Sequence, residues 1–184
     1  GQLCRSNQQA AKYISAVKKY ERDVLHNPQL LLYGEPLMRL RKGQGRPAGG
    51  KKLSNSETTY SHKINAIRDK PVKLALRLQK KSGLRVSEIV ALRESDVRLD
   101  EALRKIELRV RRGKGGNSRT VSVLEDEYLY EQLKEALGEL APEQHVFQLT
   151  AAALKKKAGS LGMETHDLRR INSRQRFRKD IEAG

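Results

Sequence analysis

Four positions in the sequence carry side chains that could act on a charged substrate. Arg85 follows a Gly-Leu pair where a helix is expected to begin, and Lys114 lies in the glycine-rich segment 112–118. His166 and Arg169 are three residues apart in an expected helix, so their side chains leave the same helical face. Guanidinium and ammonium groups bind anions, and an imidazole can also transfer a proton. Taken singly, each residue also fits an ordinary surface, turn or capping role.

The charge of the chain indicates which kind of anion to consider. Its 184 residues include 38 Lys and Arg against 22 Asp and Glu, which gives a formal net charge of +16 and a pI near 10.1. Such a charge opposes compaction unless a polyanion balances it, so nucleic acid is the first candidate partner. An anionic membrane surface is the weaker alternative. Aromatic residues make up only 4% and Trp is absent, which argues against a protein that stacks single-stranded bases.

Cysteine usage and hydropathy limit the class further. Cys4 is the only cysteine, so an internal disulfide and a cysteine-based zinc site are both excluded. No apolar run is long enough to span a bilayer, and no signal-peptide pattern opens the chain. We therefore expect a cytoplasmic protein without a membrane partner.

The chain is expected to have three parts. Residues 1–33 contain an amphipathic helix from Ser6 to Pro28, whose apolar stripe one helix cannot bury alone. Residues 34–62 are rich in Gly, Pro, Ser and basic side chains and are predicted to be a basic flexible linker. Clustering of its positive charges favours contact with a phosphate backbone over a plain solvated tether. The basic residues of this linker are Arg39, Arg41, Lys42, Arg46, Lys51 and Lys52.

Residues 63–184 are expected to form a compact domain that is mainly α-helical with a small three-stranded antiparallel sheet (α+β). A central helix begins near Asp69 and ends at Gly83. After the helix that starts at Arg85, the hydrophobic period changes from helical to alternating and then returns to helical. The expected strands lie near 97–99, 105–111 and 119–124, with a hairpin turn at 112–118, and the later helices cover 126–140, 149–161 and the residues after Thr165.

The motifs around the four candidate residues resemble those of the tyrosine recombinase (phage integrase) family. "GLRVSEI" at 83–89 is similar to the family's G-L-R-x-S-E-[LI] stretch, and "HDLR" at 166–169 is similar to its H-x-L-R box. "GKG" at 113–115, with an arginine and a valine after it, resembles the context of the family's hairpin lysine. The resemblance covers roughly residues 63–184. The helix at 6–28 also looks like the last helix of the family's core-binding domain.

The resemblance implies transesterification at a DNA phosphodiester through a phosphotyrosine, without a metal or a cofactor. Arg85 and Arg169 would hold the non-bridging oxygens, whose negative charge grows in the transition state. His166 would add a hydrogen bond there, and Lys114 would protonate the leaving 5′ oxygen from a hairpin in the minor groove. Glu88 would hold Arg85 in place, or form a plain helix pair at i, i+3.

The resemblance also implies further contacts with double-stranded DNA. Arg170 stands where the family often has histidine, which makes it an additional phosphate ligand. Arg112 and Arg119 lie on either side of the hairpin lysine and are expected to contact DNA together with the basic linker. Family members act as tetramers on DNA. We expect a tetramer on DNA for the full-length protein and a monomer for this chain as a fragment.

No nucleophile is assigned in this sequence. The family's tyrosine follows the H-x-L-R box, whereas every tyrosine of this chain precedes it. We therefore expect a fragment that begins inside the core-binding domain, ends before the nucleophile, binds DNA and is inactive by itself. The tyrosines are Tyr13, Tyr20, Tyr33, Tyr60, Tyr128 and Tyr130.

Three alternatives stay open. A non-catalytic DNA-binding or regulatory protein could use the same fold, with its arginines contacting phosphates only. An RNA- or ribosome-associated basic protein is a second alternative, and tighter binding to structured RNA than to duplex DNA would favour it. Type IB topoisomerases share the family's active-site plan, so relaxation of supercoiled DNA is a third.

Overall fold

The computed structural model of the protein describes residues 7–26 and 53–183. The chain divides into two compact units, Gly1–Lys52 and Leu53–Gly184. The basic linker residues predicted to contact DNA, from Arg39 to Lys52, lie outside the described residues.

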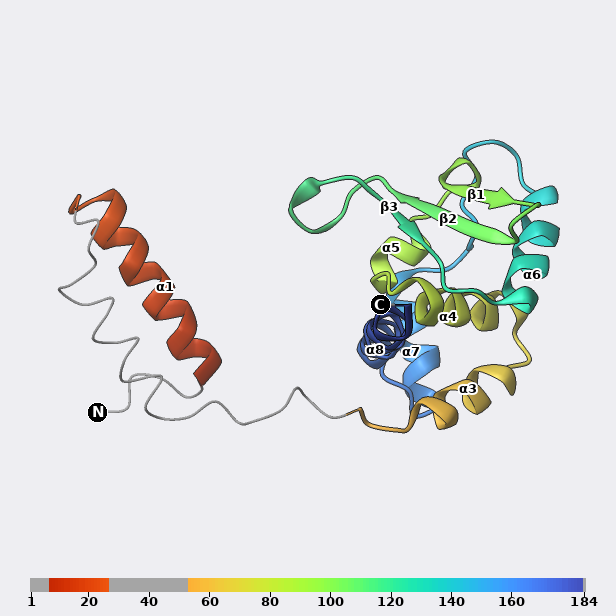
Figure 1. Ribbon diagram of the computed structural model, residues 1–184, viewed down its shortest axis with the longest axis horizontal. Coiled ribbons are helices and arrows are strands. Elements are labelled where there is room, and N and C mark those ends of the chain that lie inside the picture. The colour runs from red at the N-terminus through yellow and green to blue at the C-terminus, as the bar shows by residue number, and fades with distance from the viewer. Residues whose placement is uncertain (1–6, 27–52, 184) are drawn as a thin grey trace. The chain divides into compact units, whose positions relative to one another are not determined.

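The first unit contains helix α1 (Asn7–Asp23), which lies within the predicted span 6–28 (Figure 1). Ile14 of the predicted apolar stripe is buried, whereas Tyr13 and Tyr20 are each 55% exposed. This exposure agrees with the expectation that one amphipathic helix cannot cover its own apolar stripe.

The second unit confirms the predicted class, which is mainly α-helical with a small three-stranded antiparallel sheet (Figure 1). Two short 3₁₀ turns, η1 (Glu94–Asp96) and η2 (Lys114–Gly116), lie before β1 and between β2 and β3. The helices and strands, in chain order, are α3 (Glu57–Asn65), α4 (Lys70–Ser82), α5 (Val86–Val90), β1 (Val97–Asp100), β2 (Lys105–Val110), β3 (Arg119–Ser122), α6 (Glu127–Gly138), α7 (Ala151–Ser160) and α8 (Thr165–Ala183).

Helix α4 is the central element, and the sequence defines both of its ends. Asp69 caps the N-terminus by accepting the backbone N–H of Val72 at 3.2 Å, and Pro71 fits the first turn. At the C-terminus Gly83 adopts a left-handed φ of +73°, which glycine takes without a Cβ clash. The buried residues of α4 are Val72, Ala75, Leu76, Leu78, Gln79, Lys80 and Ser82.

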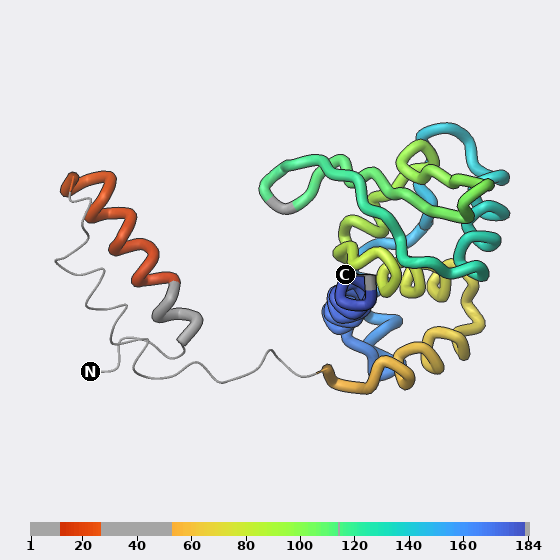
Figure 2. Tube along the Cα trace, viewed as in Figure 1, coloured from red at the N-terminus to blue at the C-terminus, as the bar shows by residue number. Residues whose placement is uncertain are grey.

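The sheet has the order β1-β2-β3 and is antiparallel throughout. On β2, the central strand, Ile106, Leu108 and Val110 are buried and join the same apolar core as α4, while the alternate residues are exposed. Val110 pairs with Arg119, so Arg119 begins β3 directly after the connection from β2. That connection projects away from α5 and α8 (Figure 2).

Helix α8 crosses α4 (Figure 1), packs against it and contributes to the same apolar core. Leu168 and Ile171 are fully buried, and Asn172 at the same level of the helix is buried as well. The first turn of α8 and the end of α4 are therefore held next to each other, which sets the positions of the predicted site residues. No described helix is both long and apolar enough to cross a membrane.

The compact unit begins earlier than the boundary at residue 63 that the sequence predicts. Helix α3 starts at Glu57, inside the predicted linker 34–62, and the Ser56 hydroxyl caps it by accepting the Thr59 N–H at 3.0 Å. Tyr60 and Ile64 of this helix are buried in the core. The run Ser-Asn-Ser-Glu at 54–57 has the composition of a linker, but it contains Ser56, the N-cap of this helix.

Candidate functional site

Arg85 lies at the N-cap position of α5, directly after the turn that ends α4. Its backbone N–H donates to Oε2 of Glu88 at 2.8 Å, and its guanidinium Nη1 donates to Oε1 at 2.9 Å. The Glu88 side chain is only 4% exposed, whereas that of Arg85 is 36% exposed. The buried carboxylate therefore fixes both the backbone and the side chain of a guanidinium that still reaches solvent.

Glu88 also accepts a hydrogen bond from a second guanidinium. Arg119, from the start of β3, donates Nη2 to Oε2 of Glu88 at 2.9 Å. Burial alone would raise the pKa of Glu88, but hydrogen bonds from Arg119 and Arg85 outweigh burial and lower it. Gly113 allows the approach of Arg119, because a Cβ at residue 113 would lie 2.5 Å from Nη1 of Arg119. Arg119, which the sequence predicts to contact DNA, is thus joined to Glu88 instead of standing free.

Arg169 reaches the same cluster from α8. Its Nε donates to the carbonyl of Gly83 at 2.9 Å, next to the start of α5. The pKa of the Arg169 guanidinium is lowered, first by burial and then by the positive charge of Arg85; the charge of Glu88 acts in the opposite direction. Two guanidiniums that are far apart in the sequence therefore lie close enough to repel each other.

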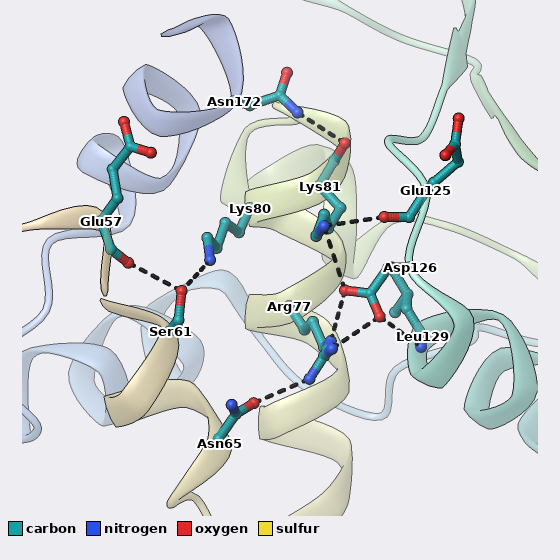
Figure 3. A network of polar contacts seen from close by, with 10 residues as sticks. All are labelled: Glu57, Ser61, Asn65, Arg77, Lys80, Lys81, Glu125, Asp126, Leu129 and Asn172. Carbon is teal, nitrogen blue, oxygen red and sulfur yellow. Dashed lines mark hydrogen bonds and ion pairs between the residues drawn. The ribbon is translucent and has the colours of Figure 1, made fainter. Parts of the chain in front are cut away.

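Asn172 holds α8 in the register that this geometry requires. Its side-chain amide donates to the carbonyl of Lys81 at 2.7 Å (Figure 3), and its oxygen accepts Nε of Arg176 at 3.0 Å. A Cβ on Gly83 would lie 2.6 Å from Oδ1 of Asn172, so glycine is needed there for contact as well as for its positive φ. Asn172 is not predicted from the sequence. The only sequence feature that indicates it is its position one helical turn after Arg169, on the buried face of α8.

Asp167 is a second residue that the motif alone does not reveal. Its Oδ2 accepts the backbone N–H of Ser54 at 2.8 Å and the hydroxyl of Tyr60 at 3.0 Å, and its Oδ1 accepts Nη1 of Arg170 at 2.6 Å. Burial would raise the pKa of Asp167, but the bonds from Ser54, Tyr60 and Arg170 lower it. Arg170 thus binds Asp167 and supports the start of α8, and its role as a phosphate ligand stays a prediction.

The other predicted residues are placed less completely. His166 is exposed in the first turn of α8, one turn before Arg169. The backbone of Lys114 lies in η2 at the tip of the β2–β3 connection, and its side chain lies outside what the structure describes. Arg112 is exposed at the base of this connection. Next to Glu88, a cavity of about 450 Å³ is lined by Arg112 and by Arg109 of β2.

The chain is similar to several solved structures of recombinases and integrases. The XerA recombinase structure aligns with a TM-score of 0.56 at 17% identity, over 95% of this chain and 70% of that chain. A lambda integrase dimer bound to a COC′ core site gives 0.48 at 15% identity, over 92% and 72% of the two chains. An integrase from mycobacterium phage Brujita gives 0.43 at 20% identity, over 94% and 58%. A search of curated proteins finds no match.

The sequence itself supplies the assignment. At these identities the likeness to XerA recombinase shows the fold alone. The profile described as the Phage integrase family, however, matches residues 53–182, which is most of the chain and nearly all of the second unit. This span includes all three motifs and also Arg85, Arg119 and Arg169, which lie around Glu88 and which we call the arginine cluster. The chain therefore belongs to the phage integrase family.

Proposed function

We propose that the chain is the DNA-binding catalytic core of a site-specific recombinase, which cleaves and rejoins DNA strands by transesterification through a phosphotyrosine intermediate. Family membership supports the recombinase role. Duplex DNA is the partner, and the net charge of +16 favours it. Members of the family act as tetramers on DNA, and we expect the same assembly for the full-length protein.

The observation that carries the proposal is the charge balance around Glu88. Glu88 forms ion pairs with the guanidiniums of Arg85 and Arg119. The guanidinium of Arg169 is close enough for the charges of all three residues to influence its pKa. Three positive charges against one negative charge leave an excess of two. This excess destabilises the charged form of Arg169, whose pKa is lowered by burial and by the neighbouring positive charge of Arg85. A phosphodiester bound between Arg85 and Arg169 would remove the repulsion.

The roles follow from where the donors lie. Arg85 and Arg169 offer forked N–H groups to the non-bridging oxygens, and they stabilise the charge that develops at the pentavalent phosphorus. Both are held before substrate arrives, Arg85 by Glu88 and Arg169 by the carbonyl of Gly83. His166 lies one turn from Arg169 and donates to the same phosphate. Lys114, at the tip of the connection between β2 and β3, is the general acid for the leaving 5′ oxygen.

The described tyrosines of the second unit are buried or lie against an arginine side chain. Tyr60 is fully buried and donates to Asp167, and Tyr128 lies beneath the guanidinium of Arg77, 4.7 Å from its ring centre. Tyr130 is fully buried beneath Arg104. We therefore propose that none of these three attacks DNA.

Covalent capture on DNA tests the proposal. The protein expressed from its entire reading frame is incubated with a nicked suicide duplex that carries its recombination site, and covalent complexes are separated on a denaturing gel. Arg85→Ala and Arg169→Ala should each lower the rate of capture by about 10²-fold to 10³-fold, as loss of one preorganised donor does. Both variants should still bind duplex DNA.

Affinity and its salt dependence provide the matched measurement. The logarithm of the duplex binding constant should fall with the logarithm of the salt concentration, with a slope of about −0.9 per phosphate neutralised. Each single arginine variant should change that slope by about 0.9 at most, which corresponds to one phosphate contact. Salt-dependent binding with no covalent complex at any DNA sequence would instead identify a non-catalytic DNA-binding protein with the same fold.

A further inference from the structure

Lys80 is a buried cation on α4 that takes no part in the arginine cluster. The residue is 8% exposed, and its Nζ donates to the hydroxyl of Ser61 on α3 at 2.5 Å (Figure 3). An ammonium group has three N–H donors, so this bond leaves two of them. Within the described part of the chain, no carboxylate forms an ion pair with Lys80. The pKa of Lys80 is lowered by burial and then by the charges of Lys81 and Arg77.

A cavity lies beside this ammonium. It has a volume of about 190 Å³ and is walled by Lys80, Lys81 and Arg77 of α4 and by Ser61 and Asn65 of α3. This volume is several times the ~30 Å³ that one water molecule takes up in the liquid. The cavity is therefore large enough for a small anion together with water.

The positive charge of the cavity is only partly balanced. Asp126 borders it and accepts two bonds from Arg77, both at 2.8 Å, while Lys81 lies 3.6 Å from the same carboxylate. The nearby carboxylate of Glu57 is paired with a different residue, Arg178 of α8, at 3.3 Å. Three cations against the one carboxylate of the cavity leave two positive charges in excess.

The donors that stay available come from both walls. Lys80 keeps two N–H groups, whereas Lys81 is already directed to Asp126 and the carbonyl of Glu125 (Figure 3). The oxygen of the Asn65 side chain accepts Nη1 of Arg77 at 2.9 Å, which leaves its amide nitrogen as a donor. An anion with several acceptor oxygens can accept hydrogen bonds from such donors in different directions.

We propose that this cavity, which we name the Lys80 cavity, binds a phosphate group, with the ammonium of Lys80 as its principal donor. The group is either free phosphate or a phosphate of the nucleic acid backbone. The Lys80 cavity shares no residue with Arg85, Glu88, Arg119 and Arg169. It is a second phosphate site, and it stands or falls independently of the proposed recombinase chemistry.

The test follows the ammonium group of Lys80 directly. Protein labelled with ¹⁵N-lysine gives side-chain ammonium signals by NMR, and the signal that Lys80→Met removes is that of Lys80. Methionine keeps the length and apolar stem of lysine, so this variant should fold. Inorganic phosphate, added at constant ionic strength against chloride, should shift the Lys80 signal along a saturating curve. In Lys80→Met, phosphate binding followed through the signal of Lys81, which also lines the cavity, should be about tenfold weaker or more, as loss of a charged hydrogen bond predicts.

The control must separate this site from the arginine cluster and from the general positive charge. Lys156→Met makes the same change on the exposed face of α7 and should leave the saturating shift of Lys80 intact. Arg169→Gln removes a cation from the arginine cluster and should also leave it intact, because sites without shared residues act independently.

Duplex DNA distinguishes the two sources of phosphate. If the DNA backbone occupies the Lys80 cavity, Lys80→Met should reduce the log–log salt slope of duplex binding by about 0.9, and phosphate should compete with DNA for the Lys80 signal. If free phosphate is the ligand, Lys80→Met leaves the slope unchanged, while phosphate still shifts the Lys80 signal of the wild type. A Lys80 signal that responds neither to phosphate nor to DNA, or that responds no more than exposed lysine signals do, would overturn the proposal.

Discussion

Glu88 and Arg119 are joined by an ion pair of 2.9 Å, although 31 positions separate them in the sequence. The pair connects the helix behind Arg85 with the first residue of β3, and thereby with the strand that follows the connection carrying Lys114. Because Glu88 holds Arg85 through its other oxygen, one carboxylate sets the position of both the first arginine and the base of the hairpin. The connection and the arginine cluster are thus parts of one polar network.

Glu88→Gln should destabilise the protein at neutral pH by about 2 kcal/mol, because two hydrogen bonds from guanidiniums lose their charged acceptor. The pKa of Glu88 is lowered in the folded state, so its contribution is fully present above the ordinary pKa of 4.5 and is lost as the pH falls through the lowered value. Urea unfolding at several pH values measures this, and the difference between the wild type and Glu88→Gln should shrink on acidification.

Glu107→Gln is the matched control for that change. Glu107 is exposed on β2, so its substitution should alter the free energy of unfolding by less than about 0.5 kcal/mol at any pH. Equal effects of the two substitutions at neutral pH would show that the bonds to Arg85 and Arg119 contribute nothing to stability.

Gly83→Ala should destabilise the protein by at least about 1 kcal/mol, because alanine resists the left-handed φ of +73° that this residue adopts. The new methyl group would also meet Oδ1 of Asn172, which fixes α8 against the carbonyl of Lys81. Gly159→Ala in α7 is the control, since nothing lies within 4 Å of a Cβ at that position and alanine favours helices. Thermal unfolding should show a lower Tm for the first variant and an unchanged or higher Tm for the second.

Asp167→Asn should cost about 3 kcal/mol, because it removes the buried charge that Arg170 pairs with and weakens the bonds from Ser54 and Tyr60. Tyr60→Phe removes only one hydroxyl of this group and should cost about 1 kcal/mol. Hydrogen exchange at the backbone N–H of Ser54 should accelerate in Asp167→Asn more than in Tyr60→Phe. Unchanged protection of that N–H in both variants would contradict the bond between Ser54 and Asp167.

Much of the fold follows from local signals in the sequence. Asp69, Pro71 and Gly83 mark the ends of α4, and alternation of apolar residues predicts the three strands within two residues of their observed ends. These features are decided by backbone preferences and by the period of the side chains. The sequence does not predict α3 as a separate element, because its Ser-Asn-Ser start has the composition of a loop and only its packing makes it part of the core.

The residues of the candidate site are likewise only partly predictable from the sequence. The order of the motifs singles out Arg85 and Arg169, but their partners depend on which elements meet in space. Arg119 looks like one more exposed arginine in the sequence, and only the sheet register brings it to Glu88. Lys80 looks like a solvent-facing lysine beside Lys81. Its burial becomes visible only when α3 covers this side of α4, because helical period alone does not say which neighbour packs where.

Lys80→Met should raise the stability of the protein at neutral pH and remove part of its pH dependence. The pKa of Lys80 is lowered in the folded state, so the unfolded chain binds more protons between that lowered value and the ordinary value of 10.5. The free energy of unfolding of the wild type should therefore gain a rising component across this window as the pH increases. At pH values below this window Lys80 is charged in both states, so the whole free-energy penalty for burying its charge lowers the stability.

Burial and the charges that face Lys80 together set the size of this effect. Lys81 and Arg77 on α4 lower its pKa, while Glu57 on α3 and Asp126 before α6 raise it, and burial is the largest influence. Urea unfolding of the wild type and Lys80→Met between pH 7 and the ordinary lysine pKa isolates the residue, because all other groups are common to both proteins. The difference should be largest at pH 7 and decline as the pH rises. A difference that does not vary with pH would mean that Lys80 titrates alike in the folded and unfolded states, and that its ammonium is not desolvated in the cavity.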